Sequence, residues 1–257
     1  MSSVLEKTSI DQQSRSRKQW QGIAVHALHE SGTMFLYRFF KRLAAERQYH
    51  LFSANNEPSN ELTVVPPADS RFCCCPLRTF ETNTTLADTS NLFRIYHVRD
   101  PRDMLVSEYF SFGWSHPAEG AGGNELVQRR KEIQEMSIDD YVLNQPEFSS
   151  WPLEEKFRPL VEKKFNSATE MLVKYETMVT RFPVWVAGVI QPFGFRIPRI
   201  AATRLAWKYR NEFRPAGKGT HKRAITPGDF RKQLRPDTIA TLNNRFAEVL
   251  EKFEYAC

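Results

Sequence analysis

The chain has 257 residues, of which 41% are hydrophobic and 26% charged, a composition that is typical of a folded globular protein and excludes wholesale disorder. Because a single hydrophobic core keeps growing up to roughly 250 to 300 residues, the length predicts one domain. The net charge of +6 suits an anionic ligand, but the 36 Lys and Arg residues are spread along the chain, so we expect no nucleic-acid partner.

The N-terminal residues and the cysteines indicate a compartment. Residues 1–19 are polar and predict a frayed segment, without the apolar run of a secretory signal, ahead of a domain of residues 20–257. The longest apolar run, "VWVAGVI", is much shorter than the about 20 residues that cross a bilayer, so we expect no membrane partner. Three of the 4 cysteines, Cys73, Cys74 and Cys75, are consecutive, which suits a reducing compartment better than disulfides or a structural metal. We therefore expect a cytoplasmic protein without a metal.

A first strand, turn and helix follow one another near the N-terminus. Residues 22–28, "GIAVHAL", form a short apolar run that predicts a strand buried on both faces. The segment "TMFLYRFFKRLAAE" then has apolar residues at helical spacing. Between them, Gly32 lets the backbone approach an anion, and the helix N-terminus offers N–H groups and partial positive charge. The turn Ser31-Gly32-Thr33 predicts a phosphate or sulfate site, with an ordinary small-residue turn as the alternative.

A second strand, turn and helix follow a segment, residues 52–91, that we expect to be mostly loop around one strand near residues 71–75. Leu92–Val98 is the predicted strand, and Asp100 and Pro101 suit the N-cap and first position of a helix. Arg99 at the strand end and Ser107 two helical turns along can reach an anion beside the first site. The alternative for "RDPRD" is a surface salt-bridge cluster.

Later segments complete an alternating pattern of strands and helices. We expect a helix over residues 125–144 that ends before Pro146, a third buried strand over residues 170–175, and a helix beginning near Pro183. Residues 214–234 predict a basic Gly/Pro loop, and a final amphipathic helix has Pro236 in its first turn. This order predicts an α/β fold with a mainly parallel sheet covered by helices on both sides.

Two common nucleotide motifs are missing from the first turn. A P-loop NTPase would place Lys directly after the final Gly of GxxxxGK[ST], but Thr33 follows Gly32. A dinucleotide site would need GxGxxG, which is also missing. Two anion sites on neighbouring strands instead predict a nucleotide with phosphate at both ends.

Three ordered motifs resemble those of sulfotransferases that use 3′-phosphoadenosine 5′-phosphosulfate (PAPS). "HESGTMF" resembles the 5′-phosphosulfate loop, "RDPRDMLVSEYF" resembles the 3′-phosphate motif, and "HKRAITPGDFRKQL" resembles the late R-K-G-x-x-G-D-W-K loop. "LVKYE" is also similar to the strand of the family that ends in Tyr-Glu. The likeness spans most of residues 21–255. It implies a single-domain, P-loop-like sulfotransferase fold and transfer of the sulfuryl group of PAPS to a hydroxyl or amine of a small-molecule acceptor, without a metal, releasing the desulfonated nucleotide PAP.

The resemblance also implies roles for the matched residues. The 5′ end of the nucleotide would be held by the backbone amides of Ser31, Gly32, Thr33, Met34 and Phe35, with the Phe35 ring on the adenine. The 3′-phosphate would be bound by Arg99, Ser107 and Arg223, assisted by Lys222. Tyr175 would lie near the adenosine, and Gly228 is the Gly of the late Gly-Asp-Trp motif.

Two departures from the family pattern concern the chemistry. Glu30 stands where the family has Lys, although negative charge grows on the departing phosphate during transfer. The segment "CCCPLRTFE" also lacks the His that is the usual general base of the family. The available bases are Glu30, His29, Glu81 and His116. Either Glu30 activates the acceptor, or the protein binds PAPS or PAP with little turnover.

The acceptor itself is not encoded in a readable motif. We expect its pocket to draw on the aromatic segment of residues 108–117 and on residues 52–80. The sequence leaves the oligomeric state open, and a homodimer is compatible with it.

Overall fold

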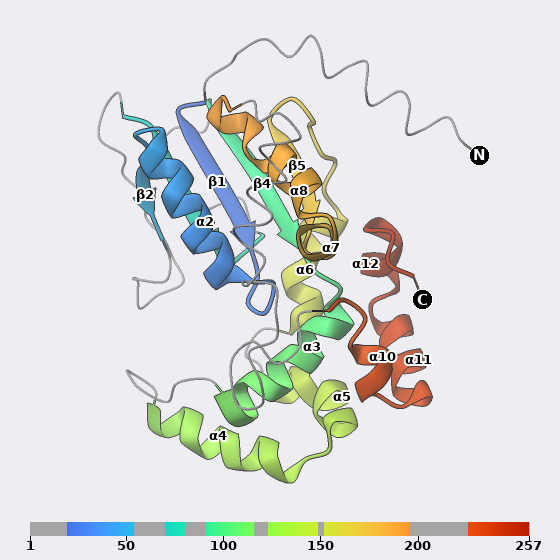
Figure 1. Cartoon of the computed structure of the whole chain (residues 1–257). Helices are drawn as coiled ribbons and strands as arrows, with labels where there is room; N and C mark the ends of the chain where they lie inside the picture. Colours follow the sequence, from blue (N-terminus) through green and yellow to red (C-terminus); the bar gives the residue numbers. More distant parts are fainter. Residues whose placement is uncertain are drawn as a thin grey trace, which may run out of the picture.

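The computed structural model describes residues 20–53, 70–80, 91–115, 123–148, 152–195 and 226–256, with backbone alone for residues 123–126 and 145–148. Its centre is a 5-stranded sheet in the order β2-β3-β1-β4-β5, in which each pair of neighbouring strands is parallel (Figure 1). The strands are β1 (Gly22–Ala27), β2 (His50–Phe52), β3 (Phe72–Leu77), β4 (Leu92–Val98) and β5 (Glu170–Lys174). The predicted α/β fold with a mainly parallel sheet is therefore confirmed.

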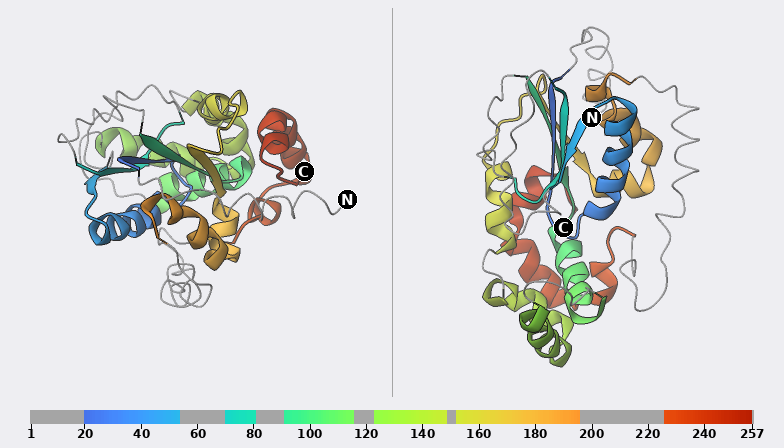
Figure 2. Two further views of the ribbon diagram at one scale, coloured as in Figure 1. Left: turned by 90° about the horizontal axis from the view of Figure 1, so that it is seen from above. Right: turned by 90° about the vertical axis from the view of Figure 1, so that its left-hand side faces the viewer.

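Helices cover both faces of this sheet (Figure 2). On one face lie α2 (Thr33–Glu46), α7 (Tyr175–Thr180) and α8 (Phe182–Val189), followed by the short 3₁₀ turn η3 (Gln191–Phe193). The other described helices pack in a second cluster with Tyr96 and Val98 of β4; they are α3 (Pro101–Phe110), the π-helical turn η2 (Ser111–Ser115), α4 (Gly123–Glu135), α5 (Ile138–Phe148), α6 (Leu153–Val161), α10 (Phe230–Gln233), α11 (Pro236–Arg245) and α12 (Ala247–Lys252). Of these, α3, α4 and α5 lie beyond the carboxyl ends of the strands (Figure 1).

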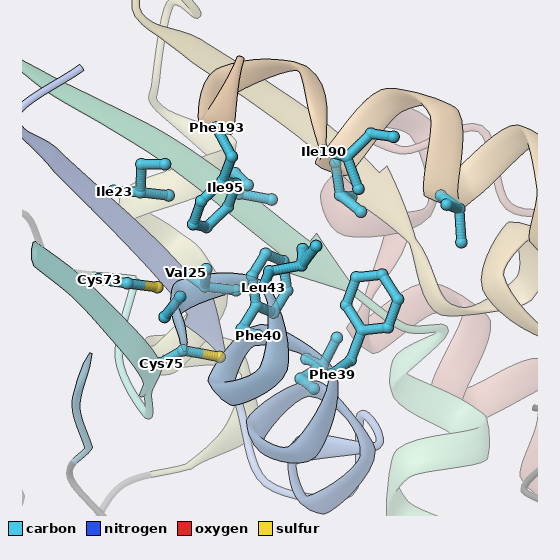
Figure 3. Close-up of a cluster of buried hydrophobic side chains, with 14 of the residues drawn as sticks. Ile23, Val25, Phe39, Phe40, Leu43, Cys73, Cys75, Ile95, Ile190 and Phe193 are labelled. Carbon is cyan, nitrogen blue, oxygen red and sulfur yellow. The ribbon is translucent and has the colours of Figure 1, made fainter. Parts of the chain in front are cut away.

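The three consecutive cysteines belong to β3 and show how the sheet is buried on both faces. Cys73 and Cys75 point into the cluster beneath α2, beside Ile23 and Val25 (Figure 3), whereas Cys74 packs on the opposite face. Burial raises the pKa of Cys74 to about 12 and raises the pKa values of Cys73 and Cys75 as well. They are protonated thiols that act as small core residues.

Several helix boundaries differ from the prediction because local capping overrides the apolar pattern. The single helix expected over residues 125–144 is interrupted before α5. There the hydroxyl of Ser137 accepts a hydrogen bond from the backbone N–H of Asp140 at 3.1 Å and donates one to the Asp140 carboxylate at 2.6 Å, as a capping residue does. The expected stop before Pro146 is wrong, since α5 continues to Phe148.

Other boundaries shift near the strand ends and the C-terminus. β5 ends at Lys174 and Tyr175 already begins α7, so the predicted strand is one residue too long. The final amphipathic helix is divided into α11 and α12 at Phe246. β2 and α6 had no counterpart in the prediction. The expected frayed segment, residues 1–19, and most of the basic loop, residues 214–225, lie outside the described residues.

His97, near the end of β4, is a buried residue with an unusual environment. It is 0% exposed, and within the described ranges neither ring nitrogen has a hydrogen-bond partner. Burial, followed by the neighbouring charge of Arg99, lowers the pKa of His97 from 6.5 to about 3. His97 therefore stays neutral in the folded protein over the range in which an exposed histidine takes up a proton.

This depressed pKa predicts a pH-dependent loss of stability that His97→Leu removes. As pH falls below about 6.5 the unfolded chain protonates His97 and the folded chain does not, which lowers the free energy of unfolding by about 1.4 kcal/mol per pH unit. Leu has a similar size and no titrating group. The plot of the free energy of unfolding against pH should therefore be shallower for the variant, by about 1.4 kcal/mol per pH unit between about pH 4 and pH 6. Urea denaturation over this range measures the slopes, and parallel curves would contradict the neutral buried state.

Candidate functional site

The turn from β1 to α2 has the backbone geometry of an anion-binding loop. Glu30 and Gly32 both have positive φ values, 62° and 82°, so the chain turns sharply on either side of Ser31. The Ser31 hydroxyl is 2.5 Å from the Leu28 carbonyl oxygen, to which it donates, and the Ser31 side chain is buried. This bond stabilises the turn, and it occupies the hydroxyl proton of Ser31.

The N-terminus of α2 is directed into this turn. Gly32 is the N-cap and has no side chain to cap the helix, and the Leu36 N–H, 3.1 Å from the Gly32 carbonyl oxygen, makes the first intrahelical bond. The preceding N–H groups are the helix donors that suit an anion. Thr33 is buried and Met34 is exposed. Phe35, the expected adenine platform, packs instead into the core against Phe39, Phe182 and Trp185, with 8% of its surface exposed.

The turn from β4 to α3 is capped as predicted. The Asp100 carboxylate accepts a hydrogen bond from the Arg102 N–H at 3.0 Å, and Pro101 occupies the first helical position. Arg99, between strand and cap, is 4% exposed. Its guanidinium donates a hydrogen bond to the backbone carbonyl of Glu30 and lies over the Tyr175 ring, 4.4 Å from the ring centre. The two predicted anion turns are therefore in direct contact.

Glu30 makes a second link between the same two turns. Its carboxylate accepts a hydrogen bond from the Ser107 hydroxyl on α3, at 2.6 Å. Ser107 is one of the residues that the resemblance assigns to the 3′-phosphate. In this structure the Glu30 carboxylate thus occupies the donor that a phosphate oxygen would use.

Tyr175, the first residue of α7, completes the contact between the turns. A Cβ atom on Gly32 would lie 3.3 Å from the Tyr175 ring, while the other side of the contact is the Arg99 guanidinium. Burial raises the pKa of Tyr175, against the opposing effect of Arg99. The residue is a neutral phenol that packs between both turns.

The late Gly-Asp-Phe segment is fixed to α3 by Asp103. The Asp103 carboxylate accepts hydrogen bonds from the backbone N–H groups of Gly228, at 2.7 Å, and Phe230, at 3.0 Å. Burial raises the pKa of Asp103 above its ordinary value, although Arg99 and the two N–H groups oppose this shift. Gly228 is therefore tied to the helix that carries Ser107. Lys222 and Arg223, a few residues earlier, lie outside the described part of the chain.

Three solved structures share this architecture. Mouse sulfotransferase SULT7A1 complexed with PAP has a TM-score of 0.62 and 14% sequence identity, and the match covers 92% of this chain and 89% of that chain. Retinol dehydratase in complex with androsterone and inactive cofactor PAP gives 0.59 and 14%, covering 90% and 80%. Retinol dehydratase in complex with retinol and PAP gives 0.56 and 15%, covering 90% and 82%. This chain has the sulfotransferase fold. No protein-family profile matches it, and no curated protein matches its sequence.

Around this sulfotransferase fold, a buried polar network that the sequence did not predict supports the second turn. Arg102 is 0% exposed and pairs with the Asp100 carboxylate at 2.7 Å. It also donates to the Ala256 carbonyl oxygen at 2.7 Å. Glu176 accepts from the Asp100 N–H at 3.0 Å and from the Tyr255 hydroxyl at 3.2 Å. The alternative interpretation of "RDPRD" as a surface cluster is wrong, because this ion pair is buried and tethers the C-terminal residues.

Two of the four candidate bases, His29 and Glu30, lie in the first turn. His29 is exposed in the first turn, and the Glu30 carboxylate is bonded to Ser107. Glu81 and His116 lie outside the described residues. Of the aromatic segment assigned to the acceptor, η2 is described: Trp114 is 46% exposed and packs on Tyr109, with ring centres 5.0 Å apart. Within the same described ranges, no cluster of three or more His, Cys, Asp or Glu side chains could hold a metal ion.

The close packing of Tyr175 on the first turn predicts a specific sensitivity at Gly32. Gly32→Ala should lower the free energy of unfolding by about 2 kcal/mol, because Ala is strained at this φ and its Cβ would crowd Tyr175 and Met178. Gly194→Ala is the matched control: its φ is 75°, but nothing lies within 4 Å of the added Cβ, so strain alone costs about 1 kcal/mol. Urea denaturation measures both, and a smaller loss at Gly32 than at Gly194 would contradict the packing.

Proposed function

We propose that this protein binds PAPS and transfers its sulfuryl group to a hydroxyl or amine of a small-molecule acceptor, releasing PAP. The observation that carries this proposal is the Arg99 side chain, which bonds to Glu30 of the first turn from its own position in the second. One nucleotide with phosphate at both ends fits two anion turns that touch. The PAP-bound structures of the same fold support the choice of nucleotide.

The proposed binding residues divide between the two ends of the nucleotide. The amides of Ser31, Gly32, Thr33, Met34 and Phe35, at the N-terminus of α2, would receive the 5′-phosphosulfate. Arg99 and Ser107 would bind the 3′-phosphate, with Lys222 and Arg223 from the late loop and with Gly228 held beside α3. The Arg99 Nε atom is buried without a hydrogen-bond partner among the described residues, so the guanidinium keeps a donor for phosphate.

In the proposed reaction, an oxygen or nitrogen of the acceptor forms a bond to sulfur while the bond from sulfur to the 5′-phosphate oxygen breaks. The acceptor proton passes to a base, and the electron pair of the broken bond goes to the phosphate. Because negative charge grows on that phosphate, the N–H groups of α2 are the donors suited to stabilise it. Glu30 and His29, in the same turn, are the proposed catalytic residues, with Glu30 as the base once its carboxylate leaves Ser107.

Binding without appreciable turnover is the second candidate function. One observation favours it: the Glu30 carboxylate is bonded to Ser107 and stands where the family has a cation.

Glu30→Lys separates the two functions, because a protonated Lys cannot accept a proton from the acceptor but can stabilise the departing phosphate. The proposed function predicts that labelled PAPS transfers its sulfuryl group to a panel of phenols and amines, and that Glu30→Lys lowers this rate by about tenfold or more. A higher rate in the variant would support the second candidate.

Androsterone and retinol occur in the retinol dehydratase complexes, and a small-molecule acceptor is proposed here by that analogy. None of the helices in the described ranges is long and apolar enough to cross a membrane. The cytoplasmic location, the homodimer and the domain boundary at residue 20 stay predictions.

Nucleotide selectivity and Arg99 test the binding step. PAP should raise the melting temperature, whereas ATP with Mg²⁺ should not, because the first turn lacks the Lys of a P-loop NTPase. Arg99→Ala should weaken PAP binding by about a hundredfold, which corresponds to about 2.7 kcal/mol, because the phosphate dianion would no longer pair with a buried guanidinium. Calorimetric titration measures the affinity. Arg42→Ala, which removes an exposed ion pair with Glu46 on α2, is the control that should bind as the parent does.

Stabilisation by ATP with Mg²⁺ and not by PAP would contradict the proposed function. Equal PAP affinity in Arg99→Ala and in the parent would contradict the role of Arg99 alone.

A further inference from the structure

Several acidic side chains surround Arg99 and oppose the binding of an anion beside it. Burial opposes the charge on the Arg99 guanidinium, but its neighbours, which include the carboxylates of Asp103, Glu30 and Glu176, raise its pKa. A phosphate dianion that enters beside Arg99 would meet these carboxylates as well as the guanidinium. Like charges repel one another in a partly buried site, so an anion beside Arg99 is favoured when a carboxylate moves away.

Two of the three carboxylates are held in place by donors from other elements. Asp103 is 1% exposed and accepts from the backbone N–H groups of Gly228 and Phe230. Glu176 accepts from the backbone N–H of Asp100 and from the Tyr255 hydroxyl. Moving either would break two hydrogen bonds, one of them from the backbone of a buried residue, Phe230 or Asp100, which is costly.

Glu30 is the carboxylate with the weaker attachment. Its side chain is partly exposed, and its described hydrogen bond comes from the Ser107 hydroxyl, a side chain that can rotate. Ser107 is also a proposed ligand of the 3′-phosphate. The carboxylate and the phosphate therefore compete for the same donor, and the competition affects the 3′ end of the nucleotide more than the 5′ end.

Building on the proposed function, we infer that Glu30 is a specificity-determining residue for the donor nucleotide. It competes with the 3′-phosphate for Ser107 and thereby reduces how strongly the protein prefers PAP to AMP, the nucleotide without a 3′-phosphate. A Lys at this position would attract both ends of the nucleotide, whereas Glu30 repels chiefly the end that approaches Ser107. The 3′-phosphate therefore contributes less to affinity in this protein than Arg99 and Ser107 would otherwise allow.

Glu30→Gln tests this inference, because Gln keeps the size of the side chain and an oxygen for Ser107 but removes the charge. Dissociation constants for PAP and AMP are measured by calorimetric titration in the parent and the variant. The ratio of the AMP constant to the PAP constant should rise by about tenfold, equivalent to about 1.4 kcal/mol. Glu46→Gln, at the far end of α2 in an exposed pair with Arg42, is the matched control and should leave the ratio unchanged.

Ser107→Ala in both backgrounds shows whether the effect acts through Ser107. In the parent this change should weaken PAP binding by about threefold or less, since Glu30 already occupies the hydroxyl. In Glu30→Gln it should weaken PAP binding by about tenfold, since a neutral amide oxygen holds the hydroxyl less strongly than a carboxylate and the phosphate can displace it. A merely structural role of Glu30 would give the same loss in both backgrounds.

The outcomes separate this inference from the function on which it rests. An unchanged ratio in Glu30→Gln, or equal losses from Ser107→Ala in both backgrounds, would overturn the competition while PAP binding itself stands. If PAP binds neither the folded parent nor folded Glu30→Gln, the proposed function is overturned, and the inference with it.

Discussion

A single guanidinium joins the ends of three neighbouring strands. Arg99 follows β4, bonds to the Glu30 carbonyl after β1, and lies over the ring of Tyr175, which follows β5. In a parallel sheet the carboxyl ends of the strands meet at one edge, where ligands of α/β folds bind. Arg99 orders that edge by donating to the backbone, and its buried Nε atom has no hydrogen-bond partner among the described residues.

The balance of charge at this edge differs from what an anion site ordinarily needs. Around Arg99 the described residues supply the carboxylates of Glu30, Asp103 and Glu176, of which two also fix the late segment and the C-terminal residues. Asp103 and Glu176 therefore stabilise the fold, and all three acids reduce the positive electrostatic potential that a phosphate would meet. In the proposed function, nucleotide affinity would depend on the displacement of Glu30 and on the basic residues of the late loop.

Local signals in the sequence predicted the parts of the fold that are locally determined. α2 and β4 have the predicted bounds, and Asp100 caps α3, because apolar period and capping chemistry act within a few residues. Phe35, which was expected to stack on adenine, is buried because its side of α2 meets Trp185, and the burial of Arg102 depends on the C-terminal residues. The bond between Glu30 and Ser107 joins side chains 77 positions apart, so no local pattern could reveal it.

A crystal structure with PAP tests the central claim most directly, namely that the two turns form one site for a nucleotide with phosphate at both ends. The account predicts the 5′-phosphate at the N–H groups of α2, the 3′-phosphate within hydrogen-bond distance of Arg99 and Ser107, and a Glu30 carboxylate that has left Ser107. PAP bound elsewhere, with the bond between Glu30 and Ser107 intact, would contradict it.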